Sequence, residues 1–509
     1  MDHLPKRHFS RRGLLETSLA AFGAVALPVG RELRSASAMA RPATPKAGDN
    51  LDVLFAELDD FVVTHMAALK IPGVAIGVIA GDREHATGFG VTNIDHPLPV
   101  DTDTRFQIGS TTKTVTGTAL MRLVEHGTLD LEAPVRTSLP DFHVADPQVS
   151  EEVQLWHLVT HTAGWQDAGF VETGDGDDAL ARYIAGMADL PQIAPLGAYF
   201  SYNNGAVCLA GRVIEAVTGQ TYEAAVTDLV LEPLGLAQTS FFPKEIMTKA
   251  FAVGHGAPPD EPHGEPVVLA PWALPRSANP AGGLIASVND MLRYARFHLG
   301  DGAANGTRLL SAESLRRMQT PLGPGGSVPG LGQIRLEAVG VSWMLWRRGG
   351  VRIVAHPGGT NGQQSTFSLV PERGFAVTVL TNAQSGLLLG FEVTDWALDR
   401  FLGLQPPPAL RTVPVDPARL AEYAGEYALP DAAETIQIRE ENGALHLVTS
   451  SSLLVPGQAE VALPLRTVGD DLAAAEFMGV PLFTEFVRDD AGTVAWVRFL
   501  GRLVPRVAT

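Results

Sequence analysis

Ser110 and Lys113 form a Ser-x-x-Lys pair within residues 106–113 of this 509-residue chain. A serine hydroxyl is a poor nucleophile until a nearby base removes its proton. Residues three apart on a helix share one face, so the lysine would lie one turn from the serine. Burial would lower the lysine pKa and leave a neutral amine that can act as the base. The pair predicts an activated serine, and a serine N-cap followed by an exposed lysine is the alternative interpretation.

Tyr202 and Asn204 belong to a second stretch, Tyr-x-Asn, at residues 202–204. A tyrosine close to a lysine can relay a proton, and an asparagine amide can hold a substrate carbonyl. A tyrosine packed at a helix start beside an asparagine cap would give the same triplet. The triplet alone therefore decides little.

His356 begins a third stretch, and it is followed by Pro357, Gly358 and Gly359. A histidine on a strand, followed by glycines, suits an edge where a ligand can reach backbone N–H groups. Proline also fits an edge position, because it cannot donate to a neighbouring strand. We expect this stretch to face a substrate.

The three motifs in this order resemble those of the penicillin-recognising serine hydrolases, and in particular of their class C β-lactamase-like branch. That family includes class C β-lactamases, D-alanyl-D-alanine carboxypeptidases, D-aminopeptidases and related esterases. The resemblance covers about residues 51–403 and extends to flanking stretches at residues 123–131, 155–164, 280–284 and 379–382.

The resemblance implies a role for each motif residue. Ser110 would be the nucleophile, Lys113 its base and Tyr202 the proton relay to the leaving group. Asn204 would hold the substrate amide. Gly358 and Gly359, together with the Ser110 N–H, would form the oxyanion side of the site. His356 would stand where the family carries its third-motif cation. The resemblance implies no metal and no cofactor.

His356 and Pro357 depart from the Lys-Thr pair that class C β-lactamases carry at these positions. A histidine of ordinary pKa, near 6.5, is only partly cationic at neutral pH, and proline supplies no hydroxyl. Both changes weaken recognition of the carboxylate that β-lactams carry. We therefore expect a peptidase or esterase rather than an efficient β-lactamase.

The hydrophobic periodicity predicts the elements that position these motifs. We expect helices over residues 51–69 and 387–401, a hairpin over 74–79 and 85–91, and strands at 351–354, 365–369 and 375–380. Residues 110–300 follow a mostly helical pattern. The fold class is α/β (α+β), and the resemblance implies a β-lactamase/DD-peptidase-like antiparallel sheet flanked by helices, with an inserted helical lobe.

A different pattern follows the proline-rich residues 405–412, which we interpret as a linker. Short alternating strands at 435–439 and 444–447 flank an Asn-Gly turn, and those at 483–487 and 494–499 flank another turn. Residues 413–509 therefore predict a small antiparallel β-barrel-like domain, and residues 41–404 the hydrolase domain.

The first 40 residues predict a twin-arginine-type export signal. Arg11 and Arg12 precede a mild apolar stretch, and residues 38–40 form a small-x-small cleavage site. No later segment approaches 18 uninterrupted apolar residues. We expect a periplasmic or secreted protein without a membrane span.

Composition excludes several other classes of function. The chain has 38 Lys and Arg against 56 Asp and Glu, a net charge of −18 that disfavours nucleic-acid binding. The single cysteine, Cys208, allows no intramolecular disulfide and no cysteine-based zinc site. His157 and His161 are four apart on an expected helix, but without an intervening glutamate motif a structural role is favoured.

The sequence therefore predicts an exported serine hydrolase that cleaves a peptide amide bond through an acyl-enzyme on Ser110. The alternatives are a carboxylesterase or β-lactamase of the same fold, or a non-catalytic binding or sensing relative. The expected partner is a small peptide, amide or ester substrate.

Overall fold

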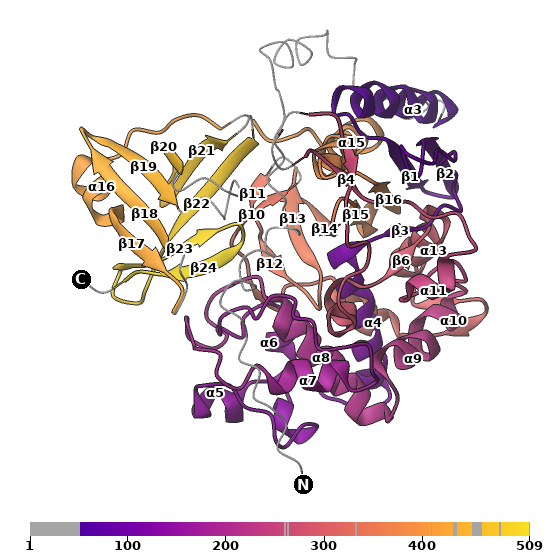
Figure 1. Ribbon diagram of the computed structural model, residues 1–509, viewed down its shortest axis with the longest axis horizontal. Helices are drawn as coiled ribbons and strands as arrows, with labels where there is room; N and C mark the ends of the chain where they lie inside the picture. The colour runs from indigo at the N-terminus through magenta and orange to yellow at the C-terminus, as the bar shows by residue number, and fades with distance from the viewer. Residues whose placement is uncertain are drawn as a thin grey trace.

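Two eight-stranded antiparallel sheets organise the residues that the computed structural model describes (Figure 1). These residues are 51–258, 261, 264–330, 333–408, 410–430, 435–449, 461–477 and 480–507. The predicted export signal at residues 1–40 lies outside the described residues.

The first sheet contains the strands that the sequence predicts on both sides of the helical lobe. Its order is β2 (Arg83–Gly90), β1 (Gly73–Ala80), β16 (Phe375–Thr381), β15 (Gln364–Val370), β14 (Val351–Gly359), β13 (Met344–Arg348), β12 (Ala338–Val339) and β9 (Gly323–Pro324). The N-terminal hairpin pairs directly with β16, with Ile76 opposite Val379. The expected hairpin and the three expected later strands are confirmed.

Helices cover both faces of this sheet, as Figure 1 shows. On one face, α3 (Leu51–Ala68) and α15 (Gly386–Leu402) lie together, and both expected helices are confirmed. The α3 side chains that face the sheet recur at helical spacing and are buried: Leu54, Phe55, Leu58, Val62 and Met66. On the other face, α13 (Val288–Leu299) packs against β1 and β16.

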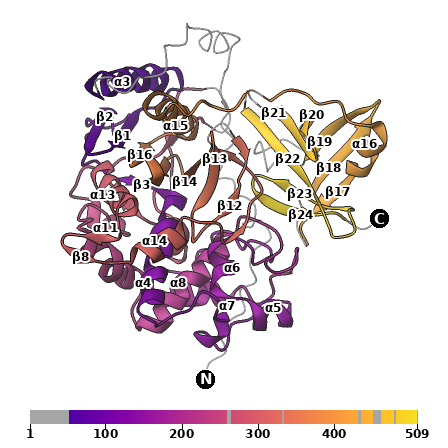
Figure 2. The same cartoon turned by 180° about the vertical axis from the view of Figure 1, so that it is seen from behind.

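The inserted lobe lies beyond α13 and carries the first two motifs. Its central helices α4 (Thr112–Glu125) and α8 (Asn204–Thr218) pack against each other and against the short helix α12 (Asn279–Gly282). The view from behind shows α4, α6, α7 and α8 grouped below the sheet (Figure 2). The lobe and this face of the sheet share one hydrophobic core.

His157 and His161 do not share a helix, contrary to our expectation. His157 belongs to α6 (Leu155–Val159), whereas His161 follows that helix with a backbone φ of +59°. The left-handed residue ends the helical path, so the four-residue spacing no longer places the two rings on one face.

The second sheet follows chain order from β17 to β24 and nearly closes into a barrel. Its strands are β17 (Gly425–Ala428), β18 (Thr435–Glu441), β19 (Ala444–Thr449), β20 (Val461–Gly469), β21 (Leu472–Phe477), β22 (Val480–Arg488), β23 (Val494–Phe499) and β24 (Arg502–Pro505). A bridge between Tyr427 and Arg506 joins its two ends. Both expected hairpins and the barrel-like architecture are confirmed.

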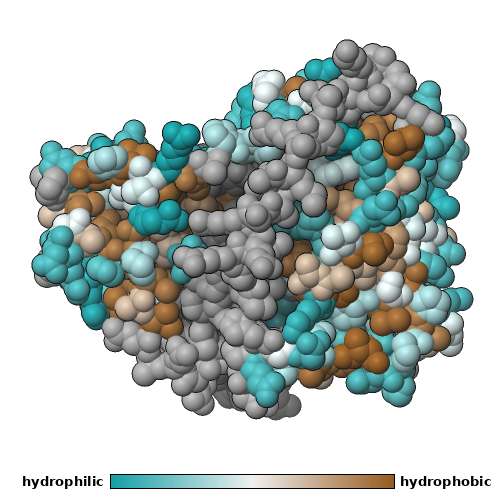
Figure 3. All heavy atoms as spheres, turned by 90° about the horizontal axis from the view of Figure 1, so that it is seen from above, coloured by the Kyte–Doolittle hydropathy of each residue, from teal (hydrophilic) through white to brown (hydrophobic). Residues whose placement is uncertain are grey.

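The barrel contacts the hydrolase part through a small hydrophobic cluster of its own. Ile193 and Ala194 pack there with Val487, Trp496 and Leu503 of the barrel. Viewed from above, the described hydrophobic and hydrophilic residues are intermixed over both parts (Figure 3). Among the described residues, no helix has the length and apolar character that a membrane span requires.

Candidate active site

Ser110 and Lys113 lie where the chain enters the lobe. Ser110 is in the 3-10 turn η1 (Gly109–Thr111), and Lys113 is in the first turn of α4. The Lys113 side chain is fully buried, and Ser110 is 4% exposed. The predicted placement on one face is confirmed, because Lys113 Nζ lies 3.0 Å from Ser110 Oγ.

Lys113 Nζ has three neighbours that together fit a neutral amine. Besides Ser110, it donates to Asn204 Oδ1 at 2.8 Å and to the Ala281 carbonyl oxygen at 2.6 Å. Those two oxygens can only accept, whereas a serine hydroxyl can donate. A neutral amine has two N–H groups that can donate to these two oxygens, and one lone pair that can accept from the Ser110 hydroxyl. Burial accordingly lowers the pKa of Lys113 to about 7.

Tyr202 is the second residue of the motifs that contacts the serine hydroxyl, after Lys113. Its phenol is hydrogen-bonded to the Ser110 side chain, and Lys113 Nζ lies 5.0 Å from its ring centroid. Burial raises the pKa of Tyr202 above its ordinary value. The phenol therefore keeps its proton at neutral pH, and Lys113 is the better base of the two.

Asn204 connects Lys113 to Asp167, a residue outside the three motifs. It begins α8, which Asn203 caps by accepting from the Ala206 N–H. Asp167 accepts from the backbone N–H groups of Asn204 at 2.9 Å and Gly205 at 3.1 Å. A carboxylate at this position also suits the positive end of the helix dipole.

The glycine end of β14 runs beside the serine. β13 pairs with β14 only as far as Ala355, so the following residues of β14 have a free edge on that side. Thr111 Oγ1 donates to the His356 carbonyl oxygen at 3.1 Å across this edge. A Cβ added to Gly358 would lie 2.8 Å from the Ser110 nitrogen, and one added to Gly109 would lie 2.4 Å from the Gly359 nitrogen. The backbones of the serine turn and of the glycine end of β14 are therefore in close contact at Ser110 and Gly359.

His356 is buried and uncharged, contrary to the partial charge expected from its ordinary pKa. Burial, together with the nearby Lys113, lowers the pKa of His356 to about 3. Nδ1 lies 2.6 Å from the Pro357 carbonyl oxygen, which can only accept, so Nδ1 carries the proton. Nε2 is buried and has no hydrogen-bond partner among the residues that the structure describes. This imidazole offers an acceptor, and it cannot replace a third-motif cation.

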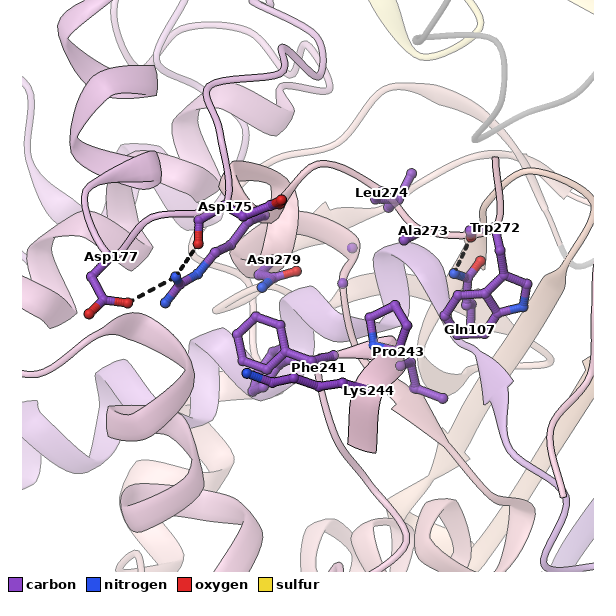
Figure 4. Close-up of a pocket in the computed structure, with 15 residues that line it drawn as sticks. Gln107, Asp175, Asp177, Phe241, Pro243, Lys244, Trp272, Ala273, Leu274 and Asn279 are labelled. Atoms are coloured by element: carbon purple, nitrogen blue, oxygen red, sulfur yellow. Dashed lines mark hydrogen bonds and ion pairs between the residues drawn. The ribbon is translucent and has the colours of Figure 1, made fainter. Parts of the chain in front are cut away.

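A cavity of about 470 Å³ lies beside the turn that carries the serine, and Gly282 forms part of its wall. Its Gly282 wall is close to the serine turn, since a Cβ added to Gly282 would lie 3.7 Å from the Gly109 carbonyl carbon. Figure 4 shows Asp175 and Asp177 at one end, and Gln107 with Trp272 at the other. The lining combines aromatic and aliphatic side chains with charged ones, including Phe241, Phe242, Leu274, Lys244 and Arg276.

Three further residues contact the site although the sequence analysis did not select them as site residues. His161 packs against Tyr202, with ring centroids 4.4 Å apart and the rings tilted by 34°. Arg502 of the barrel lies over the same tyrosine ring, and it pairs with Asp167 at 3.2 Å. Asp167 and Arg502 belong to none of the motifs or flanking stretches, because they reach the site from segments far apart in the chain, whereas His161 lies in the flanking stretch 155–164.

Comparison with known proteins agrees with this geometry. The family model described as Beta-lactamase matches residues 58–398. "Penicillin-binding protein 4" from Amycolatopsis lactamdurans is 34% identical over 358 residues, covering 69% of this chain and 92% of that protein. "Esterase EstB" from Burkholderia gladioli is 31% identical over 300 residues, covering 53% of this chain and 75% of that protein.

Solved structures resemble the chain over most of its length, including the barrel. The crystal structure of SurE superposes with a TM-score of 0.70 at 25% identity, covering 90% of this chain and 99% of that chain. The same protein, solved with D-Leu, superposes with a TM-score of 0.68.

Proposed function

The chain belongs to the Beta-lactamase family of serine hydrolases, and we propose that it is an exported enzyme that cleaves a peptide amide bond through an acyl-enzyme on Ser110. The observation that carries the proposal is the position of the buried Lys113 Nζ, 3.0 Å from Ser110 Oγ, with its other two hydrogen bonds going to Asn204 Oδ1 and the Ala281 carbonyl oxygen. A buried lysine with a pKa of about 7 is a base matched to neutral pH.

In the acylation step, Ser110 Oγ attacks the substrate carbonyl carbon while its proton passes to Lys113 Nζ. The carbonyl oxygen becomes an oxyanion, which the backbone N–H groups of Ser110 and Gly359 stabilise. When the C–N bond breaks, the Tyr202 phenol passes a proton to the leaving amine and recovers one from Lys113. Water then attacks the ester in the same way and releases the acid and Ser110.

Asn204 and His356 have supporting roles in this proposal. The Asn204 amide holds Lys113 through Oδ1 and retains N–H capacity for a substrate carbonyl. His356 Nε2, which is buried and has no partner within the described part of the chain, accepts a hydrogen bond from a substrate N–H or from Tyr202. The cavity bordered by Gly282 takes the acyl part of the substrate, whose apolar groups fit Phe241, Phe242 and Leu274.

Trapping the acyl-enzyme tests the proposal. A fluorophosphonate or a slowly hydrolysed ester should add one adduct per chain, and peptide mapping should place it on Ser110. Ser110→Ala should lose both the adduct and at least about 10⁴-fold in turnover. Ser150→Ala is the matched control, because Ser150 in α5 (Pro147–Glu152) is also buried but donates to the carbonyl oxygen of Asp146, the residue that caps this helix. Full turnover by Ser110→Ala would contradict the proposal.

A carboxylesterase activity is the second candidate, and the neutral His356 favours it over β-lactam hydrolysis. Without a cation at this position, the site has no third-motif charge for a β-lactam carboxylate. The relative named esterase adds support. A panel of L-peptides, D-peptides, p-nitrophenyl esters and nitrocefin separates the candidates, and the D-Leu bound to SurE is the reason for including D-residues.

Export by the twin-arginine route is the part of the proposal that rests on residues 1–40 alone. Replacing Arg11 and Arg12 by lysine should retain the full-length chain in the cytoplasm. Fractionation and N-terminal sequencing of the exported form test this. A mature N-terminus unaffected by the double substitution would contradict it.

A further inference from the structure

The turn between β23 and β24 of the barrel holds the segment that carries Tyr202. The Gly501 carbonyl oxygen accepts from the Tyr202 N–H at 2.9 Å. On either side, the Leu503 N–H donates to Ser201 Oγ at 3.1 Å, and Arg498 Nε donates to the Phe200 carbonyl oxygen at 3.1 Å. Three consecutive residues of the hydrolase part are thus hydrogen-bonded to the barrel.

The side chain of Arg502 extends this contact into the site. Its guanidinium lies 5.2 Å from the Tyr202 ring centroid and pairs with Asp167 at 3.2 Å. Both side chains are largely buried, at 13% and 7% exposed. Asp167 in turn holds the backbone of Asn204, whose side chain holds Lys113. The contacts therefore run without a break from the barrel to the base of the reaction.

We propose that the C-terminal barrel completes the active site, with Arg502 as a positioning residue that orients Tyr202 and Asp167 for the reaction at Ser110. This inference rests on the proposed function, because it needs Tyr202 and Lys113 to act on Ser110. Arg502 acts through these residues, since its guanidinium contacts Asp167 and the Tyr202 ring.

The charges around Lys113 make the proposal testable by pH. Burial is the largest cause of its lowered pKa, Asp167 raises that pKa, and Arg502 lowers it. The other titratable neighbours are neutral at pH 7: Cys208 of α8, with a pKa raised to about 12, His161 and His356, with lowered pKa values, and Tyr202, with a raised one. Arg502 and Asp167 therefore act on Lys113 in opposite directions.

The test compares Arg502→Met with Asp167→Asn in the full chain. Arg502→Met should lower kcat about tenfold or more and move the acid limb of the pH profile upward by about one unit. Asp167→Asn keeps an oxygen that accepts from the α8 N–H groups but removes the negative charge. The acid limb of its pH profile should therefore move to lower pH. Arg502→Lys should keep the limb near the wild-type position, because it keeps the charge.

Leaving-group dependence gives a readout specific to Tyr202. The amine that leaves from an anilide needs a proton, whereas p-nitrophenolate does not. If the tyrosine is displaced in Arg502→Met, kcat should therefore fall more for an anilide than for a p-nitrophenyl ester of the same acyl group. Arg506→Met is the matched control, since Arg506 lies over Tyr427 inside the barrel and donates to the Glu422 carbonyl oxygen. Its pH limb and anilide-to-ester ratio should equal those of the wild type.

The outcomes separate this inference from the proposed function. A raised KM for Arg502→Met, with an unchanged kcat and limb, would mean that Arg502 binds substrate and would overturn the inference. Unchanged kinetics in a folded Arg502→Met, shown by its melting curve, would overturn it as well. A wild-type chain that a fluorophosphonate does not label at Ser110 would overturn the proposed function and the inference with it.

Discussion

The charge state of Lys113 is decided by which groups surround its amine. Two carbonyl oxygens take its N–H groups, and a hydroxyl faces the remaining position. An ammonium would have to donate to all three and would have no water around it. The lysine is therefore a base because of its burial, and the Ser-x-x-Lys spacing alone would not make it one.

The acid limb of kcat/KM should lie near pH 7 for every substrate. Below that pH Lys113 is protonated and cannot take the serine proton, so activity is lost as the pH falls through the pKa of about 7. The measurement is kcat/KM for a neutral ester from pH 5 to 9. A limb near pH 4 to 5 would instead indicate a carboxylate base and would contradict this assignment.

His356 should not sense substrate charge in the neutral range. Because burial lowers its pKa to about 3, the imidazole stays neutral from pH 6 to 8. The ratio of kcat/KM for a carboxylate-bearing ester to that for its neutral amide analogue should therefore be flat over this range. Nitrocefin should be a poor substrate throughout. A ratio that falls as the pH rises through 6.5 would mean that the imidazole titrates with an ordinary pKa.

At the scale of elements, the close approach of η1 and β14 brings their backbones into contact beside Ser110. Gly109 has a φ of +49°, and its position leaves no room for a side chain next to the Gly359 nitrogen. Both properties require glycine, since other residues rarely adopt this φ and carry a Cβ. The short turn before α4 therefore brings the serine nitrogen and the β14 backbone together.

Gly109→Ala should reduce kcat by about 100-fold or more, because one oxyanion donor is displaced as the two backbones separate. Gly127→Ala is the matched control. Gly127 also has a positive φ, +73°, but nothing lies within 4 Å of the added Cβ. The control should lose about 1 kcal/mol of stability from backbone strain and keep its kcat. Normal kcat in a folded Gly109→Ala would show that the β14 backbone is not an oxyanion donor.

At the scale of the whole molecule, each of the two parts has its own core. The two large hydrophobic clusters of the hydrolase part contain only residues before position 405, and the main barrel cluster contains only residues after 412. The contact between the parts depends on a small cluster, the hydrogen bond that Glu485 of the barrel accepts from the Ser327 N–H, and the hydrogen bonds around Tyr202. The predicted linker at residues 405–412 remains a prediction, and these separate cores support it.

A chain that ends at Gln405 should fold but lose most of its activity. Its cores are complete, so far-UV circular dichroism should show a cooperative thermal transition. That transition should lie below that of the full chain, because Ile193 and Ala194 lose their partners. Turnover should fall since Tyr202 loses its Gly501 contact. An insoluble product would show that the two parts fold only together.

The sequence by itself determined the features that depend on neighbours along the chain. The Ser110–Lys113 contact spans three residues, and the hairpins at β1–β2 and β18–β19 close through short turns, so local spacing suffices to predict them. The order of the three motifs also sufficed for the family, which the match over residues 58–398 confirms. The roles of the site residues, Asn204 and Gly358 included, stay proposals.

Only the tertiary structure decided the groups that adjust this chemistry. Asp167 and Arg502 are 335 residues apart in the chain, so no local pattern relates them. The neutral state of His356 likewise depends on burial by segments from several parts of the fold. Desolvation and long-range charge pairing are sums over everything packed around a group, and that sum exists only once the chain has folded.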